Sequence, residues 1–322
     1  MKNVPVRVLI HEDFASELAK VLATPHALRT IKAQSDSEIA RTMSETDVFV
    51  SGEFKAAWRD PKGACPRLVQ SVGAGIDAID LASLPPGCVV CNVYGHERGV
   101  AEHAFLLMLA LQRKLFQLDA ALRQGDWTPE HFYLPELRNR RFLVLGLGHI
   151  GSELVRWGRF LDMKVTALTR SPSAPRGEKA GAHVVGGFDE LGKHLGEADF
   201  VVVAIPATAE TANLIGEKEF ERMKPSAFLI NVGRALVVNE AALYEALRSR
   251  RIAGAGLDVW YQYPNSIAEK RFPSRFPLQE LDNVIMTPHK PTAETMAYRW
   301  EKIAENVGRF ARGEPLLNVV RG

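Results

Sequence analysis

The stretch RFLVLGLGHIGSELVRWGRFL, residues 141–161, decides the fold expected for this chain. Residues 142–145 are a short apolar run of the kind that forms a buried strand, and the last part of the stretch has helical periodicity. Between them, Gly146, Gly148 and Gly151 have the spacing G-x-G-x-x-G. This order predicts a strand that passes through a tight glycine turn into the N-terminus of a helix, where a pyrophosphate can approach the backbone. The candidate ligand is therefore a dinucleotide.

Length and composition are those of a folded protein with two domains of ordinary size, since 46% of the 322 residues are hydrophobic and 24% are charged. Forty basic and 38 acidic side chains give a formal net charge of +2 without a dense basic run. We therefore expect no nucleic acid or membrane as partner, whereas a small anionic substrate is compatible. The N-terminus has no signal-peptide pattern, and the longest strongly apolar run, 104–111, is too short to cross a bilayer. A cytoplasmic protein is expected.

Short apolar runs alternate with helical stretches along most of the chain. Before the glycine turn, strands are predicted at residues 6–10, 47–50, 67–72 and 88–93. After it, strands are predicted at residues 164–168, 182–185, 200–205, 227–232, 252–259 and 283–286. The alternation predicts an α/β protein whose parallel sheets are covered by helices. The second run, together with the strand of the glycine turn, predicts a Rossmann-type doubly wound sheet.

Two long helical segments bear on the domain organisation. Residues 99–112, GVAEHAFLLMLALQ, are apolar on nearly every side, which suits a helix between domains, at a subunit contact or in an ordinary core. Residues 292–312 form a final helix that is long enough to return to the N-terminal part. The predicted domains are therefore 1–95 with 291–322, and 96–290.

Three side chains follow predicted strands in the second domain: Arg234, Asp258 and His289. Because ligands of open α/β sheets bind outside the carboxyl ends of the strands, these side chains are expected on the same edge as the glycine turn. A guanidinium binds an anionic substrate, and an imidazole exchanges the proton that accompanies a hydride. Taken singly, each residue has an equally good structural interpretation. Arg234 could cap a helix or form a surface ion pair, Asp258 could terminate a strand, and His289 could be an ordinary loop histidine.

Six segments resemble the D-isomer-specific 2-hydroxyacid dehydrogenases, in the order of that family. They are SVGAGID (71–77), VAEHAFLLMLAL (100–111), the glycine turn, NVGR (231–234), AGLDV (255–259) and TPH (287–289). The resemblance implies a flavodoxin-like substrate domain built from both ends of the chain, with a nicotinamide-binding Rossmann domain inserted in it. It also implies an active site in the cleft and a homodimer formed largely through the nicotinamide domains.

The resemblance further implies roles for single residues. Arg234 resembles the arginine that binds the substrate carboxylate and polarises its carbonyl, and His289 resembles the general acid/base. The backbone at Ala74 and Gly75 resembles the loop that holds the carboxylate, while Asp258 resembles the aspartate that faces the nicotinamide. The candidate cofactor-binding residues are Gly146, Gly148, His149, Ile150, Gly151, Thr169, Arg170, Ile205, Pro206, Val232, Gly233 and Asp258.

Two positions depart from the family pattern. Tyr263 stands five residues after Asp258, where the family has a glutamate that pairs with the histidine, and its role is left open. A neutral phenol stabilises an imidazolium less than a carboxylate does. Thr169 occupies the slot of the acidic residue that binds the ribose 2′-hydroxyl of NAD, with Arg170 behind it. These residues favour NADP over NAD, unless Arg170 simply points to solvent.

The sequence thus predicts an oxidoreductase that reduces small 2-oxo acids of the glyoxylate or hydroxypyruvate type with NADP or NAD as cofactor, and no metal. One alternative is oxidation of formate or phosphite, which fits a histidine without its glutamate. Another is a dinucleotide-sensing protein that has lost catalysis; Tyr263 favours this alternative, and the presence of both Arg234 and His289 argues against it.

Overall fold

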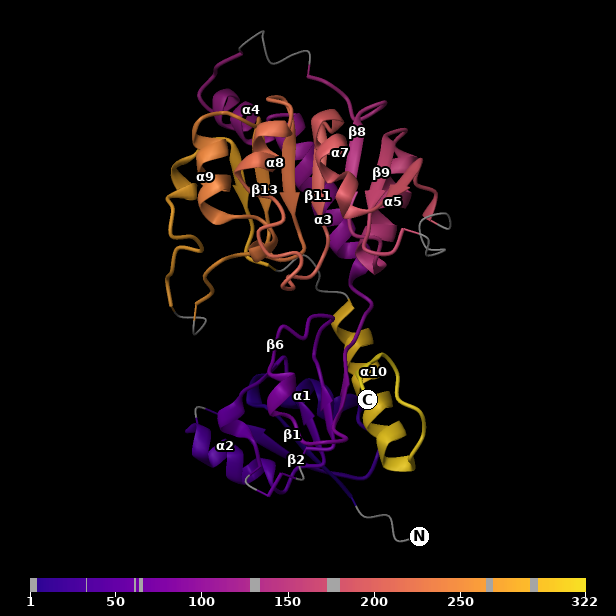
Figure 1. The fold of residues 1–322 in the computed structure, drawn as a ribbon. Helices are drawn as coiled ribbons and strands as arrows, with labels where there is room; N and C mark the ends of the chain where they lie inside the picture. The colour runs from indigo at the N-terminus through magenta and orange to yellow at the C-terminus, as the bar shows by residue number, and fades with distance from the viewer. Residues whose placement is uncertain are drawn as a thin grey trace. The chain divides into compact units, whose positions relative to one another are not determined.

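The computed structural model describes residues 5–32, 34–60, 62–63, 66–127, 134–172, 180–264, 269–289 and 295–322. The chain divides into two compact units, one formed by Met1–His96 with Thr292–Gly322 and the other by Glu97–Pro291 (Figure 1). Each unit is built on a largely or wholly parallel sheet, so the predicted α/β class is confirmed.

The sheet of the first unit has the strand order β15-β7-β5-β3-β1-β2. Its strands are β1 (Val6–His11), β2 (His26–Ile31), β3 (Val48–Val50), β5 (Leu68–Gln70), β7 (Val89–Cys91) and β15 (Val319–Arg321). The five strands from β2 to β7 are parallel in the order typical of flavodoxin, and β15 is antiparallel to β7. A small second sheet pairs β4 (Glu53–Phe54) with β6 (Ala78–Ile79).

Alternate residues of β1 supply both faces of this sheet, as expected for a buried parallel strand. Val8 and Ile10 pack in one core cluster with Trp300, and Leu9 packs in another with Met43 and Phe49. The first cluster is covered by helices α1 (Glu12–Val21) and α10 (Thr295–Arg312), and the second by α2 (Asp36–Met43) and the 3₁₀ turn η1 (Ala56–Trp58). The C-terminal helix is therefore part of the core of the N-terminal unit.

The second unit contains a seven-stranded parallel sheet with the order β10-β9-β8-β11-β12-β13-β14. Its strands are β8 (Arg141–Leu145), β9 (Lys164–Leu168), β10 (Val184–Gly186), β11 (Phe200–Val203), β12 (Phe228–Asn231), β13 (Gly254–Leu257) and β14 (Val284–Met286). Counted from β8, the order is that of the Rossmann fold, which confirms the predicted doubly wound sheet.

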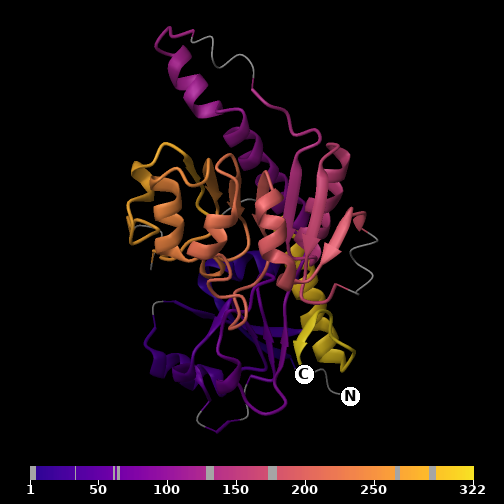
Figure 2. The same ribbon diagram turned by 45° about the horizontal axis from the view of Figure 1, so that its top comes forward.

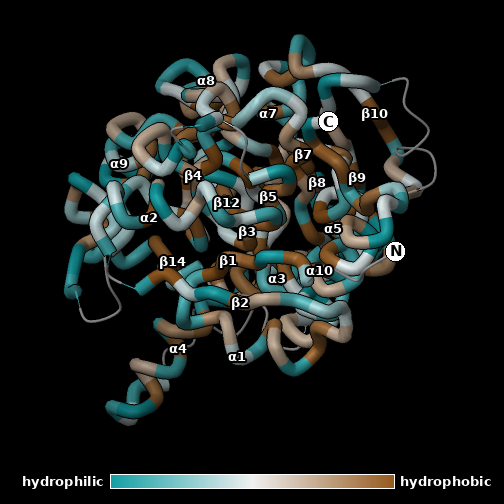
Figure 3. The backbone as a smooth tube through the Cα atoms, turned by 90° about the horizontal axis from the view of Figure 1, so that it is seen from below, coloured by the Kyte–Doolittle hydropathy of each residue, from teal (hydrophilic) through white to brown (hydrophobic). Residues whose placement is uncertain are grey.

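Helices cover both faces of this second sheet. They are α3 (Glu97–Gln112) and α5 (His149–Phe160) on one face, and α7 (Leu191–Glu197), α8 (Glu217–Arg222) and α9 (Glu240–Arg248) on the other (Figure 1). Phe142 and Val144 of β8 face α3 and α5, whereas Leu143 and Leu145 face the opposite core. In Figure 3, β8 and β9 lie in hydrophobic stretches of the tube, and many outer turns are hydrophilic. Asn239 caps α9 as expected, since its Oδ1 accepts from the Ala242 N–H at 3.0 Å.

The sequence analysis omitted β2, β15 and α4 (Leu115–Leu122). Helix α4 has no buried residue and extends away from the sheet of its unit (Figure 2). Helix α3 is less buried than its composition suggested, because Leu106 and Leu109 are 55% and 42% exposed while its other side packs on the sheet. Among the described residues, no helix combines the length and apolar character needed to span a membrane.

Candidate active site

The glycine turn joins the carboxyl end of β8 to the start of α5. Gly146 has φ +107°, which a residue with a side chain rarely adopts, and its N–H donates to Leu168 O at 2.7 Å. A Cβ on Gly151 would collide with the Gly146 carbonyl oxygen, so the third glycine permits the helix to pack against the turn. By contrast, a Cβ on Gly148 would meet no atom within 4 Å. Gly146 and Gly151 thus allow the tight turn and its contact with the helix, and Gly148 leaves the space at the start of α5 open.

The residues around this turn fit a dinucleotide phosphate. Gly148 is the N-cap of α5, and a hollow of about 260 Å³ is lined in part by Gly148, His149 and Ser152. The N–H groups that point out of a helix start and the helix dipole both favour an anion there. Of the other candidates, Ile150 packs in the core beneath this turn. Ile205, Val232 and Gly233 are buried just beyond the ends of β11 and β12, and Pro206 is exposed.

Thr169 and Arg170 follow the carboxyl end of the neighbouring strand β9. The Thr169 N–H donates to Gly186 O at 2.9 Å, which fixes the backbone at the end of the strand. The Arg170 side chain is 80% exposed, and its guanidinium lies 3.9 Å from the Glu210 carboxylate, which is 73% exposed. A surface pair of this kind contributes little, so the guanidinium can readily exchange its partner for a phosphate.

Arg234 is positioned by a turn that Asn231 closes at the end of β12. The buried Asn231 side chain accepts from the Gly233 N–H and donates to Arg234 O, both at 3.1 Å. The Arg234 guanidinium in turn donates to Gly233 O at 2.8 Å. This arrangement explains the NVGR motif, because the asparagine shapes the turn that carries the arginine.

Asp258 follows β13 and organises the turn that carries His289. Its Oδ1 accepts from the Thr287 hydroxyl at 2.6 Å and from the His289 N–H at 3.0 Å. His289 has φ +56°, a left-handed conformation that costs a residue with a side chain roughly 1–3 kcal/mol. The hydrogen bond that the His289 N–H donates to Asp258 offsets part of this cost and holds the histidine in place. The structure therefore brings Asp258 and His289 together directly.

His103 belongs to this cluster, although the sequence analysis assigned it no role. Its Nε2 lies 2.9 Å from Thr287 Oγ1 and 3.5 Å from Asp258 Oδ1. Because the Thr287 hydroxyl donates its proton to Asp258, its oxygen accepts from His103 Nε2–H. The only signal in the sequence is one histidine within the apolar helix 99–112, and this signal does not reveal a partner 184 residues away.

Tyr263 contacts His289 from the loop after β13. The phenol oxygen lies 2.9 Å from His289 Nδ1 and accepts from the Trp260 N–H at 3.1 Å. Desolvation by the surrounding protein lowers the pKa of His289; Arg234 lowers it further, and Asp258 opposes the shift. Partial burial raises the pKa of Tyr263, against the effects of the Trp260 N–H and Arg234. At neutral pH the pair therefore consists of a neutral imidazole and a protonated phenol.

Ala74 and Gly75 lie in the other unit, in the loop that follows β5. Their carbonyl groups are held in place, since Asn92 Nδ2 donates to Ala74 O at 2.9 Å and the Ser71 hydroxyl donates to Gly75 O at 3.0 Å. Within the described part of the chain, neither N–H group donates a hydrogen bond. The loop therefore offers two fixed backbone donors of the kind that binds a carboxylate.

Comparison with known proteins identifies the family of the chain. Residues 105–290 match the family model described as the NAD binding domain of D-isomer specific 2-hydroxyacid dehydrogenase. The chain belongs to this dehydrogenase family.

Individual relatives of the chain differ in length and in name. A D-3-phosphoglycerate dehydrogenase of Archaeoglobus fulgidus is 38% identical over 79% of this chain but only 47% of its own length. The chain spans 59% of a second such protein, from Methanocaldococcus jannaschii, at 31% identity. A glyoxylate reductase of Korarchaeum cryptofilum is 33% identical over 99% of this chain and 94% of its own.

A solved structure shares the fold over nearly the whole chain. It is an NADPH-dependent glyoxylate/hydroxypyruvate reductase of Sinorhizobium meliloti in complex with NADP and malonate. The TM-score is 0.82 at 26% identity, and the match covers 98% of this chain and 97% of that one.

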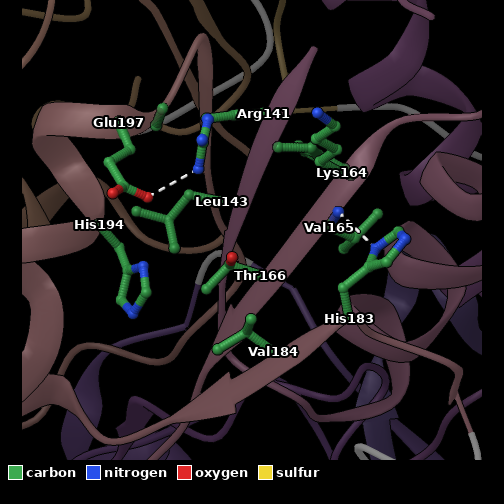
Figure 4. Close-up of a pocket in the computed structure, with 11 residues that line it drawn as sticks. Arg141, Leu143, Lys164, Val165, Thr166, His183, Val184, His194 and Glu197 are labelled. Atoms are coloured by element: carbon green, nitrogen blue, oxygen red, sulfur yellow. Dashed lines mark hydrogen bonds and ion pairs between the residues drawn. The ribbon is translucent and has the colours of Figure 1, made fainter. Parts of the chain in front are cut away.

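A second cavity of the unit that holds the glycine turn lies at the opposite edge of the seven-stranded sheet. It measures about 280 Å³ and is lined by the amino ends of β8 and β9 and by α7 (Figure 4). Figure 4 shows Arg141 paired with Glu197 at 2.8 Å, and the Val165 N–H donating to His183 Nδ1 at 3.0 Å. Because it lies away from the glycine turn and most of its lining is apolar, this cavity is not the dinucleotide site.

Proposed function

We propose that the chain reduces small 2-oxo acids to D-2-hydroxy acids with a nicotinamide cofactor, with glyoxylate and hydroxypyruvate as the first substrates. One observation carries the proposal: in the unit that holds the glycine turn, Asp258 fixes His289 in a strained conformation by accepting from its N–H at 3.0 Å, and Arg234 follows the end of a neighbouring strand of the same sheet. An anion-binding cation beside a proton-exchanging imidazole suits reduction of a carbonyl next to a carboxylate. Relatives named glyoxylate reductase support this substrate class.

In this mechanism the bound nicotinamide supplies a hydride to the carbonyl carbon. Arg234 binds the carboxylate and stabilises the negative charge that develops on the carbonyl oxygen. His289 exchanges the proton at that oxygen, and Asp258 keeps the His289 backbone in place through the 3.0 Å hydrogen bond. We assign the Ala74 and Gly75 N–H groups to the substrate carboxylate, with 1–95 and 291–322 as the substrate domain and 96–290 as the nicotinamide domain.

NADP is proposed over NAD. Arg170 is largely exposed at the end of β9, and the Glu210 carboxylate 3.9 Å from its guanidinium is largely exposed as well. NAD-binding proteins of this fold have an acidic residue in the slot of Thr169, and that residue binds the ribose 2′-hydroxyl. Such a carboxylate would repel a 2′-phosphate, whereas the threonine hydroxyl does not. The NADP-bound relative of Sinorhizobium meliloti is compatible with this preference.

A homodimer is also proposed, with α4 as part of the contact. Helix α4 buries none of its residues within the chain, and Leu115, Phe116 and Leu122 are 50%, 58% and 52% exposed. Trp127 beyond it is 70% exposed. Apolar side chains on a projecting helix are typical of a subunit interface. Sedimentation velocity is expected to show a dimer that Phe116→Asp converts to monomer; a wild-type monomer would contradict this proposal.

The deciding experiment measures kcat/KM on a panel of 2-oxo acids with NADPH and with NADH, and on formate and phosphite with NADP⁺ and NAD⁺. We expect turnover of at least one small 2-oxo acid, with NADPH preferred. Turnover of formate or phosphite alone would replace this function with donor oxidation, which a histidine without a carboxylate partner allows. Cofactor binding, followed by nicotinamide fluorescence, without turnover of any panel compound would indicate a sensing protein.

A further inference from the structure

The hydrogen bonds of the Tyr263 phenol limit where its proton can point. A backbone N–H can only donate, so at 3.1 Å the Tyr263 oxygen accepts from Trp260. The other polar contact of the hydroxyl among the described residues is His289 Nδ1 at 2.9 Å, where the donor depends on the histidine tautomer. In one of the two arrangements the phenol, which already accepts from Trp260, donates its proton to Nδ1.

A proton in this position also determines the tautomer of the histidine. A neutral imidazole carries one proton, and the nitrogen that accepts a hydrogen bond is the one without it. If Nδ1 accepts from Tyr263, the proton of His289 is on Nε2. A glutamate at position 263 would produce a different state, because a carboxylate can only accept and would require a proton on Nδ1.

We propose that Tyr263 is a positioning residue that holds neutral His289 in its Nε2–H form and replaces the proton that His289 gives to the substrate. The proton-transfer part of this inference rests on the proposed reduction of 2-oxo acids, whereas the tautomer does not depend on it.

In the proposed transfer, every proton and electron pair is accounted for without forming an imidazolium. As the carbonyl carbon takes up a hydride from the nicotinamide cofactor, the carbonyl π pair moves onto oxygen, and the Nε2 proton is transferred to that oxygen. The Tyr263 proton moves to Nδ1, which leaves a neutral imidazole and a phenolate. After product release, solvent protonates His289 Nε2 and the Nδ1 proton returns to the phenolate of Tyr263, which is 46% exposed; this restores the starting Nε2–H tautomer and the neutral phenol. An alkoxide is a stronger base than a phenolate, so the transfer is favourable overall.

The surroundings of the pair oppose and assist this transfer in different ways. Among the described residues, the charged and titratable groups around it are Arg234, Asp258, His103 behind Asp258, and Arg271, which donates to the Tyr263 carbonyl at 3.3 Å. Burial raises the pKa of Tyr263 and so disfavours a phenolate, while the Trp260 N–H and Arg234 act in the opposite direction. The lowered pKa of His289 keeps imidazolium scarce at neutral pH, where a proton source other than imidazolium is needed.

Histidine NMR tests the tautomer without any turnover. Long-range ¹H–¹⁵N spectra of protein with ¹⁵N-labelled histidine, with the His289 signal assigned by its loss in His289→Gln, are expected to show the Nε2–H form at about pH 7.5. Tyr263→Phe keeps the ring and removes only the hydroxyl, so the Nε2–H preference should weaken. An Nδ1–H tautomer in the wild type, or an unchanged spectrum in Tyr263→Phe, would overturn the proposal.

The pH profile of reduction tests the proton transfer. In the wild type, kcat is expected to vary less than about threefold between about pH 6 and 8.5. In Tyr263→Phe the proton must come from imidazolium, so kcat should fall about tenfold per pH unit above the lowered pKa of His289. In Tyr263→Glu the fall should begin at higher pH, because a carboxylate raises the pKa of the histidine. Equal profiles in all three proteins would refute the transfer.

The two experiments separate this inference from the proposed function. Absence of turnover in the wild type, together with an Nε2–H tautomer that Tyr263→Phe loses, would reject the reductase function and keep the assignment of the hydrogen bond. Turnover of a 2-oxo acid by the wild type, together with an unchanged tautomer in Tyr263→Phe, would keep the reductase function and reject the role of Tyr263.

Discussion

The two edges of the seven-stranded sheet use polar residues in opposite ways. At the amino edge, charges neutralise one another: Arg141 pairs with Glu197, and Asp199 accepts from the Arg141 N–H and from Lys224, all at 2.8 Å. At the carboxyl edge, Asp258 holds the backbone of His289 at a positive φ. Strained conformations persist only where their surroundings enforce them, and they concentrate at functional sites. Positive φ also occurs at the amino edge, at Asn139, Asp162 and Arg250, so strain alone does not separate the two edges. The carboxyl edge differs because a carboxylate there fixes a histidine that can exchange a proton, whereas the carboxylates of the amino edge neutralise cations.

The largest effect expected from this comparison is the loss of activity on truncation at the carboxyl edge. Arg234→Ala should lower kcat by about 10²–10³, because a preorganised charge at the carbonyl oxygen is removed. His289→Ala should lower it by about 10²–10⁴ through loss of the proton donor. Arg141→Ala, the matched control at the amino edge, should change kcat less than about twofold. Steady-state kinetics on the best 2-oxo acid checks all three variants. A loss of kcat in Arg141→Ala as large as in the other two would show that the carboxyl edge is not specifically the catalytic edge.

A smaller effect is expected on cofactor choice. Arg170→Asp replaces a cation at the end of β9 with a carboxylate that repels a 2′-phosphate and accepts from a 2′-hydroxyl. The ratio of kcat/KM for NADPH to that for NADH should fall by about tenfold or more. Glu210→Gln is the control, because it removes the carboxylate that lies 3.9 Å from the Arg170 guanidinium. This variant should keep the preference for NADPH or increase it. A wild-type preference for NADH would contradict the assignment.

The open space at Gly148 predicts a change in binding without a change in folding. A Cβ there meets no protein atom, and the φ of −73° suits any residue, so Gly148→Ala should keep the melting temperature. The methyl group would occupy the space in front of α5 and raise the Kd of the dinucleotide by about tenfold. Gly151→Ala, whose Cβ would collide with the Gly146 carbonyl, should destabilise the unit instead. Fluorescence titration and thermal unfolding distinguish the two variants; unchanged dinucleotide affinity in Gly148→Ala would remove this position from the site.

The smallest expected effect concerns stability at the amino edge. The Arg141 and Glu197 side chains are 51% and 48% exposed, so their ion pair should contribute about 0.2–1 kcal/mol. Urea unfolding of Glu197→Gln at low and high salt measures this contribution, which should shrink as salt rises. A loss well above this range would mean that the edge is held by more than ordinary surface pairing.

Elements with a strong apolar pattern were predictable from the sequence. The strands β8, β11 and β12 bury nearly every residue, and their order follows from the alternation with helices. The edge strand β2 was missed because three of its six residues are exposed. Helix α4 was missed because it buries none of its side chains, so no internal contact imposes a pattern on its sequence.

The site was predictable only to the level of strand ends. That logic singled out Arg234, Asp258 and His289; Asp258 accepts from the His289 N–H, and the Arg234 charge lowers the pKa of His289. Strand ends alone do not orient the phenol of Tyr263, and its pairing with His289 was indicated instead by the resemblance, which placed Tyr263 in the slot of the glutamate that pairs with the histidine. His103 was missed for a similar reason: a helix pattern predicts which face is buried but not which distant group it meets.

The division of the chain also sets the order in which it can fold during synthesis. The first unit leaves the ribosome early, but its core lacks Trp300, Ile303 and Val307 of α10, and its sheet lacks β15, until the last residues have emerged. All seven strands of the second sheet are present once residue 286 has emerged. The Rossmann unit can therefore complete its sheet while the N-terminal segment still exposes a half-covered core, and a chaperone that binds nascent chains would find its target at the beginning of this chain rather than in the middle.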